Sequence, residues 1–415
     1  MSTGAEAFEP WAWQTSATVL APAEALDASS SARAQPQRPW DQEQQEQLQA
    51  SIRSSPVGIE SRRLAQQLLQ QQDPRVLQHH ADALRRDLVG ETVTYVRNRN
   101  LNFTNHCIQH CSFCAFRRDP DQPGAYWHSI EELQRRAAEA AGLGASELCL
   151  QGGLNAAAQI NGSLLAYYAA LLGALRDAAP GLHLHAFSPQ ELLFIAQQDG
   201  IPLQAVLETL ASAGLNSVPG TAAEVLSESV RQRLCPEKLT AREWCAVVLQ
   251  VHRSGLPSTS TLMAGHLESP ADRAAHLLTL VALQQEARQH QGAGFTEFVL
   301  LPFIGAQAPA PLRQRVGRDQ PDREAMLVLT AQSRLVLGEW IINHQPSWVK
   351  LTLAGATEAL RWGCNDLGGT LMEESITSMA GAQGGTSQSA AALEAAAHSL
   401  HRPVRERTTL YGVRS

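Results

Sequence analysis

The spacing of apolar residues changes along the chain and divides it into distinct parts. Residues 1–45 are rich in Ala, Ser, Gln and Pro and show no sustained period. They are predicted to be a disordered tail, with at most a short helix in the Gln/Glu-rich part. Residues 46–90 are predicted to form one or two helices, because apolar side chains recur there at helical spacing, at Leu64, Leu68, Leu69, Val76, Leu77 and Leu84.

Residues 91–376 alternate between short apolar stretches and helical patterns. Strands are expected at 92–103, 147–151, 182–187, 215–218, 258–263, 296–300, 347–353 and near 365. Helix starts between them are marked by capping sequences, which begin at Ser129, Ser188, Thr221, Thr240 and Ser269. This alternation predicts an α/β fold with a parallel sheet. About eight units over this length fit a (β/α)8 TIM-type barrel. An open doubly wound sheet is the alternative.

Residues 377–415 are expected to follow the barrel as a C-terminal extension. A Gly-rich stretch at 381–387 predicts a flexible loop, and residues 390–400 have a helical pattern. Within the barrel region, a further helix is expected at 323–342 and a short one at 357–362.

Composition narrows the class of protein. The chain has 415 residues, of which 44% are hydrophobic, so it can form one large barrel with additions. Its net charge of -7 argues against nucleic-acid binding. There is no apolar run of membrane-spanning length, and the N-terminus lacks the pattern of a secretory signal. The seven cysteines, three of them clustered, fit a reducing cytoplasm better than a disulfide framework.

The clustered cysteines have the spacing C-x3-C-x2-C, at Cys107, Cys111 and Cys114. Closely spaced thiolates suit an iron–sulfur cluster, and a four-iron cluster held at three corners leaves one iron open for a small molecule. Phe113, just before the third cysteine, could shield the cluster from water. Two alternatives are a zinc site with a neighbouring histidine and three buried core cysteines. Zinc sites usually add a second C-x2-C pair or a histidine pair, and neither is present.

The barrel prediction also places several unusual residues together. Active sites of such barrels lie on the loops that follow the strands. The cysteine loop follows the first predicted strand, Gly152 and Gly153 follow the second, and Ser188 follows the third. The stretch 265–268, which ends at Glu268, follows the fifth. These residues are therefore expected on one rim.

Nine stretches of the sequence resemble one family. They are N-R-N-L-N-F-T-N-H-C (98–107), C-S-F-C-A-F (111–116), L-C-L-Q-G-G (148–153), H-A-F-S-P-Q-E (185–191), V-P-G-T-A-A-E (218–224), S-T-L-M-A-G-H-L-E (260–268), F-T-E-F-V-L-L-P-F (295–303), N-D-L-G-G-T-L-M-E-E (365–374) and R-T-T-L-Y (407–411). Together they resemble the second subunit of FO synthase, in the radical S-adenosylmethionine (SAM) superfamily. The resemblance covers roughly residues 60–412. Ala264 departs from it, because a bulkier residue is expected before Gly265.

The resemblance implies two cofactors and a set of residues that hold them. A [4Fe-4S] cluster would be bound by Cys107, Cys111 and Cys114, with its fourth iron bound by the amino and carboxylate groups of SAM. The remaining cofactor-binding candidates are Phe113, Gly152, Gly153, Ser188, Glu224 and Glu268. The glycines could instead form a turn that needs positive φ. Glu224 could instead cap a helix, as the fourth residue of a capping box that begins at Thr221. Glu191 is expected to be a helix cap, and no catalytic acid or base is assigned.

The implied reaction joins the 4-hydroxybenzyl group of L-tyrosine to 5-amino-6-(D-ribitylamino)uracil. Its products are the 5-amino-5-(4-hydroxybenzyl)-6-(D-ribitylimino)-5,6-dihydrouracil adduct, 2-iminoacetate, methionine and 5'-deoxyadenosine. The resemblance further implies an external electron donor and a companion radical SAM subunit. That companion would close the ring to 7,8-didemethyl-8-hydroxy-5-deazariboflavin (FO).

Two other functions are open at the level of sequence. Radical SAM enzymes of the menaquinone route share the cysteine pattern and would act on a futalosine-type substrate instead of tyrosine. A ferredoxin-like electron carrier, or a metal-stabilised binding protein, would not cleave SAM. The chain is far longer than one cluster needs, which counts against this second alternative. Further polar residues that could contact substrate are His183, His185, Arg231, Arg233, Asn365, Asp366 and Glu373.

Overall fold

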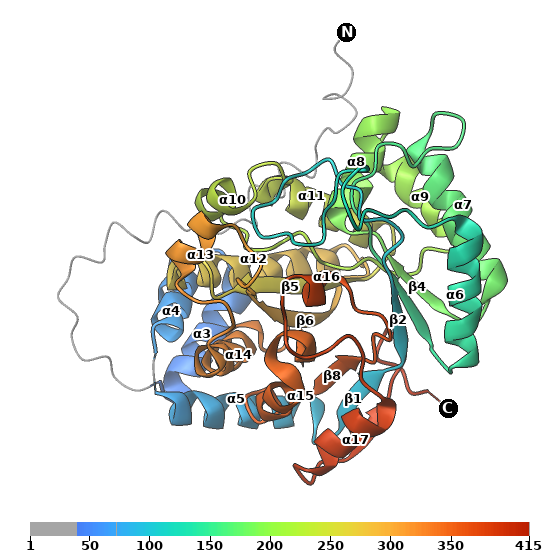
Figure 1. Ribbon diagram of the computed structural model, residues 1–415. Coiled ribbons are helices and arrows are strands. Elements are labelled where there is room, and N and C mark those ends of the chain that lie inside the picture. Colours follow the sequence, from blue (N-terminus) through green and yellow to red (C-terminus); the bar gives the residue numbers. More distant parts are fainter. Residues whose placement is uncertain (1–39, 72, 415) are drawn as a thin grey trace.

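The computed structural model describes residues 40–71 and 73–414, and its strands lie in three parallel, three-stranded sheets (Figure 1). The first contains β8 (Asp366–Gly369), β1 (Val93–Val96) and β9 (Val404–Glu406). The second contains β2 (Asn98–Leu101), β3 (Glu147–Leu150) and β4 (His183–Ala186). The third contains β5 (Ser258–Ala264), β6 (Phe295–Pro302) and β7 (His344–Pro346). The predicted α/β class with parallel strands is confirmed.

Short contacts link the borders of these sheets. The predicted strand at 92–103 divides at Arg97 into β1 and β2, which belong to different sheets. Parallel bridges from His185 to Ser217 and from Val218 to Ser258 connect the second sheet to the third. The backbone N–H of Asn365, just before β8, donates to the carbonyl of His344 in β7 at 3.1 Å. The described strands thus follow one another in the predicted order without forming one continuous eight-stranded sheet.

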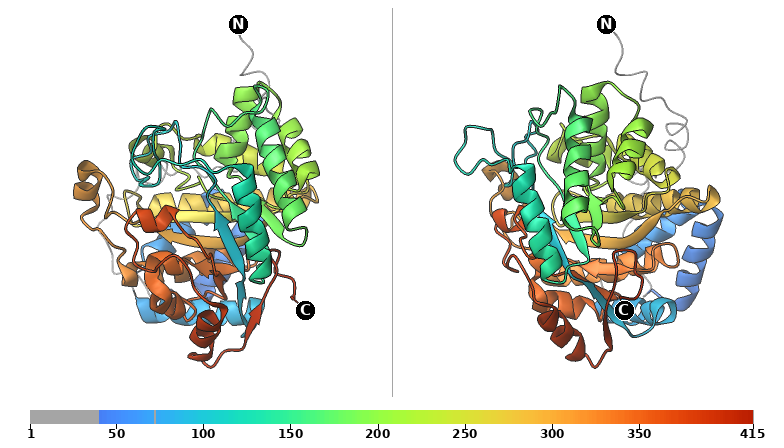
Figure 2. Two further views of the ribbon diagram at one scale, coloured as in Figure 1. Left: turned by 45° about the vertical axis from the view of Figure 1, so that its right-hand side comes forward. Right: turned by 90° about the vertical axis from the view of Figure 1, so that its right-hand side faces the viewer.

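Helices lie outside the strands (Figures 1 and 2). The N-terminal helices are α3 (Gln42–Ser54), α4 (Ile59–Leu69) and α5 (Pro74–Val89), which pack against α12 (Pro270–Gln289) and α14 (Arg323–Leu337). The others are α6 (Ile130–Gly142), α7 (Leu164–Ala178), α8 (Pro189–Asp199), α9 (Leu203–Ala213), α10 (Glu228–Leu234), α11 (Ala241–Arg253), α13 (Ala310–Val316), α15 (Trp348–Ala359), α16 (Ile376–Met379) and α17 (Ala390–His398). In the described ranges, no helix combines the length and apolarity needed to cross a membrane.

Most predicted helix starts are confirmed by their capping bonds. The side chains of Ser129, Ser188, Thr240 and Ser269 each accept a hydrogen bond from the backbone N–H three residues later. The predicted cap at Thr221 is wrong. Residues 221–227 form no helix, because Ala222 and Glu224 have left-handed φ angles of 65° and 44°, and α10 begins only at Glu228.

The strand predicted at 347–353 is also wrong, because these residues begin α15. The strand of this unit is β7, just before them. The helix is interrupted at Thr352, whose φ of 64° and ψ of 164° are not helical. This break hides the helical period, so the alternating apolar residues of the first turn resemble a strand in the sequence.

The predicted tail is too long at its C-terminal end. Residues 1–39 lie outside the described residues, but Trp40 is 1% exposed and Asp41 caps α3 with a full capping box. The amide of Gln45 donates to the carbonyl of Leu335 in α14 at 2.9 Å, and Trp40 donates to Gln45. The short helix allowed for the Gln/Glu-rich part is thus the start of α3, and Gln45 binds a backbone carbonyl at the end of a core helix.

The C-terminal residues return to the interior of the strand layer, below the starts of β1 and β8. Arg407 donates to Asp366 at 2.5 Å and to Glu297 at 3.1 Å, and its guanidinium lies 4.0 Å from the ring centroid of Tyr411. The Tyr411 hydroxyl donates to Glu297 at 2.5 Å. Arg407 and Tyr411 therefore tie the C-terminal extension to β6 and β8, and it does not only lie beside the strands.

Replacing Arg407 with leucine should destabilise the protein strongly. The carboxylates of Asp366 and Glu297 would stay buried without their cation, a change that costs about 3–5 kcal/mol. The free energy of unfolding in urea measures this loss. Arg405→Leu is the matched control, since Arg405 is exposed on β9 and should tolerate the change. Equal stability of the two variants would contradict the structural role of the pair.

Candidate active site

A cavity of about 380 Å³ lies where the strands end. Its wall combines the cysteine loop with residues that follow β3, β4, β6, β7 and β8 and with residues inside β5. The predicted site residues in this wall are Cys107, Cys111, Phe113, Cys114, Gly152, Gly153, Ser188 and Glu224. Eight of the nine site residues predicted from the sequence therefore meet in one cavity, and Glu268 is the exception.

Polar side chains hold the cysteine loop in place. Asn105 accepts a hydrogen bond from the Tyr126 backbone N–H and donates to the Gly124 carbonyl, each at 2.8 Å. The Ser112 hydroxyl donates to the carbonyl of Leu234 at 2.6 Å. These bonds explain the presence of Asn105 and Ser112 in the loop, because an irregular backbone at a cavity needs side-chain partners for its polar groups.

The three thiols fit a cluster by their position in one cavity wall. Burial raises the pKa of Cys107, and it raises the pKa of Cys111 to about 12. The Lys238 ammonium opposes both shifts, so it favours the thiolate form that iron requires. In the part of the chain that the structure describes, no group of three His, Cys, Asp or Glu residues is placed to hold a single metal ion. The fit to a cluster therefore rests on the shared cavity.

The two glycines after β3 are required by close packing. A Cβ on Gly153 would lie 2.2 Å from the His106 carbonyl oxygen and 2.9 Å from the Cys107 Cβ. A Cβ on Gly152 would lie 2.5 Å from the ring of Phe103. Neither glycine has a positive φ, so the alternative of a positive-φ turn is wrong. The absence of a side chain at these two positions allows the cysteine loop to pack closely against the end of β3.

Ser188 and Glu191 form the predicted cap at the start of α8. The Ser188 hydroxyl and backbone N–H both donate to Glu191 at 2.7 Å. Glu191 also accepts from the Gly152 backbone N–H at 3.0 Å, which joins this cap to the glycine pair. Burial raises the pKa of Glu191 to about 7, and hydrogen bonds from Ser188 and Gly152 partly offset that effect.

Glu224 faces the cavity as half of a buried ion pair. Its Oε1 lies 2.6 Å from the Lys238 Nζ, which in turn lies 5.4 Å from the centroid of the Phe113 ring. Burial alone would raise the pKa of Glu224, but Lys238 outweighs it and the pKa is lowered. Because no helix starts at Thr221, the capping role is removed and Glu224 remains a candidate for binding a ligand.

Glu268 is not brought to the cavity. Its carboxylate accepts from the backbone N–H groups of Gly265 and His266 at 2.6 and 2.9 Å, and from Arg273 at 2.7 Å. Its side chain is fully buried by these partners. Glu268 therefore anchors the backbone of its own loop. The sequence alone does not distinguish this role from that of a residue that binds a ligand.

Most of the other polar candidates bind groups of the protein itself. His183 and His185 both contact the Ser217 hydroxyl, at 2.7 and 2.6 Å, and burial lowers the pKa of His185 to about 4. Arg231 is buried and donates to backbone carbonyls, including that of Leu239. Arg233 is exposed. Asn365 and Asp366 lie at the start of β8, away from the rim, and Glu373 pairs with Arg99.

Sequence reasoning missed several polar residues in the cavity wall, among them Asn100, Lys238, Gln345 and Lys350. Asn100 lies in β2, and its buried Oδ1 has no hydrogen-bond partner among the described residues. One signal was available for the lysines. Only two of the 33 basic residues are lysines, at 238 and 350, and both line this cavity.

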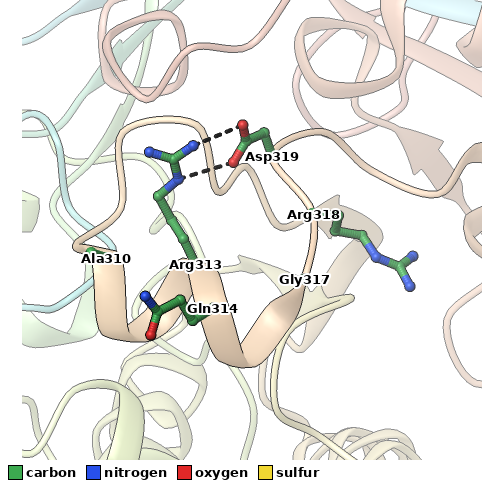
Figure 3. Close-up of a pocket in the computed structure, with 6 residues that line it drawn as sticks. All are labelled: Ala310, Arg313, Gln314, Gly317, Arg318 and Asp319. Carbon is green, nitrogen blue, oxygen red and sulfur yellow. Dashed lines mark hydrogen bonds and ion pairs between the residues drawn. The ribbon is translucent and has the colours of Figure 1, made fainter.

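A second hollow lies on the surface at α13, apart from the cysteines. It is open, and Arg313 spans it with hydrogen bonds to Asp319 at 3.0 and 2.9 Å (Figure 3). Its second arginine, Arg318, pairs with Asp322 at 3.2 Å, so both are already paired, and no predicted site residue lines the hollow. The cavity with the three thiols is therefore the candidate active site.

Adding a methyl group at Gly153 should displace the cysteine loop. The His106 carbonyl is backbone and cannot turn away as a side chain could, and overpacking of this kind costs about 1–3 kcal/mol. We expect Gly153→Ala to bind much less iron and sulfide per chain after anaerobic reconstitution. Gly173→Ala is the control, because a Cβ there meets nothing within 4 Å. Normal iron content in Gly153→Ala would contradict the packing argument.

Comparisons with known families cover most of the chain. Residues 101–280 match the model of the radical SAM superfamily, and residues 292–414 match that of the CofH/MqnC C-terminal region. Among solved structures, methylornithine synthase (PylB) has a TM-score of 0.63 at 13% identity, covering 87% of this chain and 97% of that one. The hydrogenase maturase HydG from Carboxydothermus hydrogenoformans has a TM-score of 0.64 at 13% identity, covering 99% and 87%. These two likenesses concern the fold alone.

Curated relatives are much more similar in sequence. A protein of Cyanothece sp. (strain PCC 7425) is 58% identical over 83% of this chain and 92% of its own length. One of Synechocystis sp. (strain PCC 6803) is 57% identical over 83% and 89%. Both are named 5-amino-6-(D-ribitylamino)uracil–L-tyrosine 4-hydroxyphenyl transferase. The chain therefore belongs to this family of transferases, within the radical SAM superfamily.

Proposed function

We propose that this protein is a radical SAM transferase that joins the 4-hydroxybenzyl group of L-tyrosine to C5 of 5-amino-6-(D-ribitylamino)uracil. The observation that carries the proposal is the 58% identity to a transferase of that name over 92% of its length. The Cα–Cβ bond of tyrosine breaks, a bond to C5 forms, and the rest of tyrosine leaves as 2-iminoacetate. SAM is cleaved to methionine and 5'-deoxyadenosine.

Cys107, Cys111 and Cys114 would hold a [4Fe-4S] cluster, with its fourth iron left to the amino and carboxylate groups of SAM. When bound, the cluster and SAM together supply a reducing electron and a carbon radical that can take a hydrogen atom from tyrosine. The location of the three cysteines in one cavity wall supports this assignment. An external electron donor is part of the proposal, because an oxidised cluster must first be reduced before SAM can be cleaved.

The remaining cavity residues would position SAM. Glu224, oriented by Lys238, offers a carboxylate oxygen that can accept a hydrogen bond from a ribose hydroxyl. Gly152, Gly153 and Ser188 form the adjoining wall, where small residues leave room for the methionyl end. Phe113 packs with Cys111 in an apolar cluster that limits the access of water to the sulfurs. Glu268, expected as a ligand, is proposed instead to anchor the loop beside this wall.

The shape of the site suits a reactive intermediate. We propose that the three sheets act together as a (β/α)8-type barrel whose mouth is the cavity. Arg407 and its carboxylate partners fill the opposite end of the interior, and Met263, Leu301 and Phe303 make part of the cavity wall apolar. Exclusion of water and of stray hydrogen donors protects a carbon radical until the intended substrate reacts.

The adduct would be consumed by a companion radical SAM subunit that closes the deazaflavin ring to FO. The menaquinone-route alternative, with a futalosine-type substrate, is less well supported. Eight relatives between 53% and 58% identity carry the transferase name. No comparable observation favours the electron-carrier alternative, which would leave the substrate-sized cavity without a use.

The proposal predicts two products in an anaerobic assay. The reconstituted, reduced protein is incubated with SAM, L-tyrosine and 5-amino-6-(D-ribitylamino)uracil, and mass spectrometry follows 5'-deoxyadenosine and the uracil adduct. We expect both products from the wild type and neither from Cys111→Ala, because that variant loses a cluster ligand. Cys245→Ala is the matched control, since it removes a buried thiol of α11 that does not line the cavity.

The assay separates the alternatives. Deoxyadenosine without the adduct would keep the radical enzyme but contradict tyrosine and the uracil as its substrates. No deoxyadenosine from protein with a full complement of iron would contradict the radical SAM assignment itself.

A further inference from the structure

The cavity wall contains the only two lysines of the chain. Arginine supplies 31 of the 33 basic residues in the chain, and both lysines line the cavity. Lysine carries a compact ammonium group on a flexible stem, whereas arginine has a planar fork that is always charged. In a chain that otherwise uses arginine, two lysines at one site indicate that a compact cation is needed there.

The two lysines differ in their partners. Lys238 pairs with Glu224, and a third cation of the wall, Arg117, pairs with Asp119. Lys350 has no side-chain hydrogen bond or ion pair with any described residue, although it is largely enclosed by the cavity wall. Burial lowers the pKa of Lys350 to about 8, against a weaker opposing effect of Glu374 and Glu224. A cation that is largely enclosed and has no protein partner is stabilised when a ligand supplies the anion.

The neighbouring carboxylates are already occupied. Glu374 accepts hydrogen bonds from the backbone N–H groups of Thr377 and Ser378 at 2.6 and 2.9 Å. Glu224 is held by Lys238. The protein thus gives Lys350 two carboxylates within electrostatic range but neither as a direct partner, which leaves its ammonium available to a bound molecule.

The backbone around Lys350 is held in an unusual conformation. Lys350 lies in a single turn that ends at Thr352, whose φ is 64°. Trp348 anchors the turn by donating to the carbonyl of Gly369 at 2.9 Å. Gly384 packs against it so closely that a Cβ there would lie 2.2 Å from the Trp348 carbonyl oxygen. Strained backbone that is fixed by its surroundings is common at ligand sites, and here it aims one lysine at the cavity.

We propose that Lys350 binds the α-carboxylate of the amino-acid substrate. The inference rests on the proposed function, which brings three molecules to the cavity. The carboxylate of SAM is assigned to the fourth iron, and the ribitylaminouracil carries no carboxylate. The carboxylate of tyrosine is therefore the one that still lacks a cationic partner, and Lys350 is the cation of the cavity wall that still lacks an anion.

The test compares two ligands and two variants under anaerobic conditions. Equilibrium dialysis measures the affinity of the reconstituted protein for L-tyrosine and for tyramine, which has the same ring and amine but no carboxylate. We expect Lys350→Met to weaken tyrosine binding about 10- to 100-fold, as the loss of one charge-assisted hydrogen bond does, and to leave tyramine binding unchanged. Lys350→Arg should retain part of the tyrosine affinity.

Three outcomes would overturn the inference. Unchanged tyrosine affinity in Lys350→Met would show that the lysine does not hold the substrate. An equal loss of tyrosine and tyramine binding would indicate a damaged cavity. A loss of SAM affinity alone would assign the lysine to the carboxylate of the cofactor. Adduct formation by the wild type is measured in parallel, so failure of the proposed function is seen separately from failure of this inference.

Discussion

The closeness of the cysteine loop to the end of β3 is the constraint on which the site depends. The His106 carbonyl occupies the space that any side chain on Gly153 would need, so the loop and the strand fix each other's position. Glu191 reinforces this contact, because it binds Gly152 and also caps α8. The contacts of Gly152 and Gly153 thus fix the position of the three thiols relative to the rest of the cavity.

Charged side chains lie at both ends of the strand layer, but their partners differ. At the starts of the strands, Arg407 is satisfied by Asp366 and Glu297, and Tyr411 completes the group. Such a saturated network stabilises the fold and has no capacity left for a ligand. At the ends of the strands the cavity keeps a cation, Lys350, without a protein partner. The stabilising network and the candidate active site therefore lie at opposite ends of the strands.

The sequence predicted the parallel α/β class, four of five capping sequences and the meeting of the cysteines with the glycine pair, because these features depend on local patterns. The errors come from interactions that are distant in sequence or from interrupted patterns. Thr352 interrupts α15, so the apolar pattern of residues 347–353 resembles that of a strand. Trp40 and Gln45 are ordered by α14, which lies far along the chain. Glu268 binds its own loop, and local sequence does not distinguish that use from ligand binding.

The central claim is that this cavity holds a four-iron cluster on three cysteines with one iron open to SAM. Mössbauer spectroscopy of the anaerobically reconstituted protein tests it most directly, with spectra taken before and after SAM is added. The account predicts four irons per chain, one of which changes its signal when SAM binds while the other three do not. Four irons that are all indifferent to SAM, or fewer than four irons per chain, would contradict it.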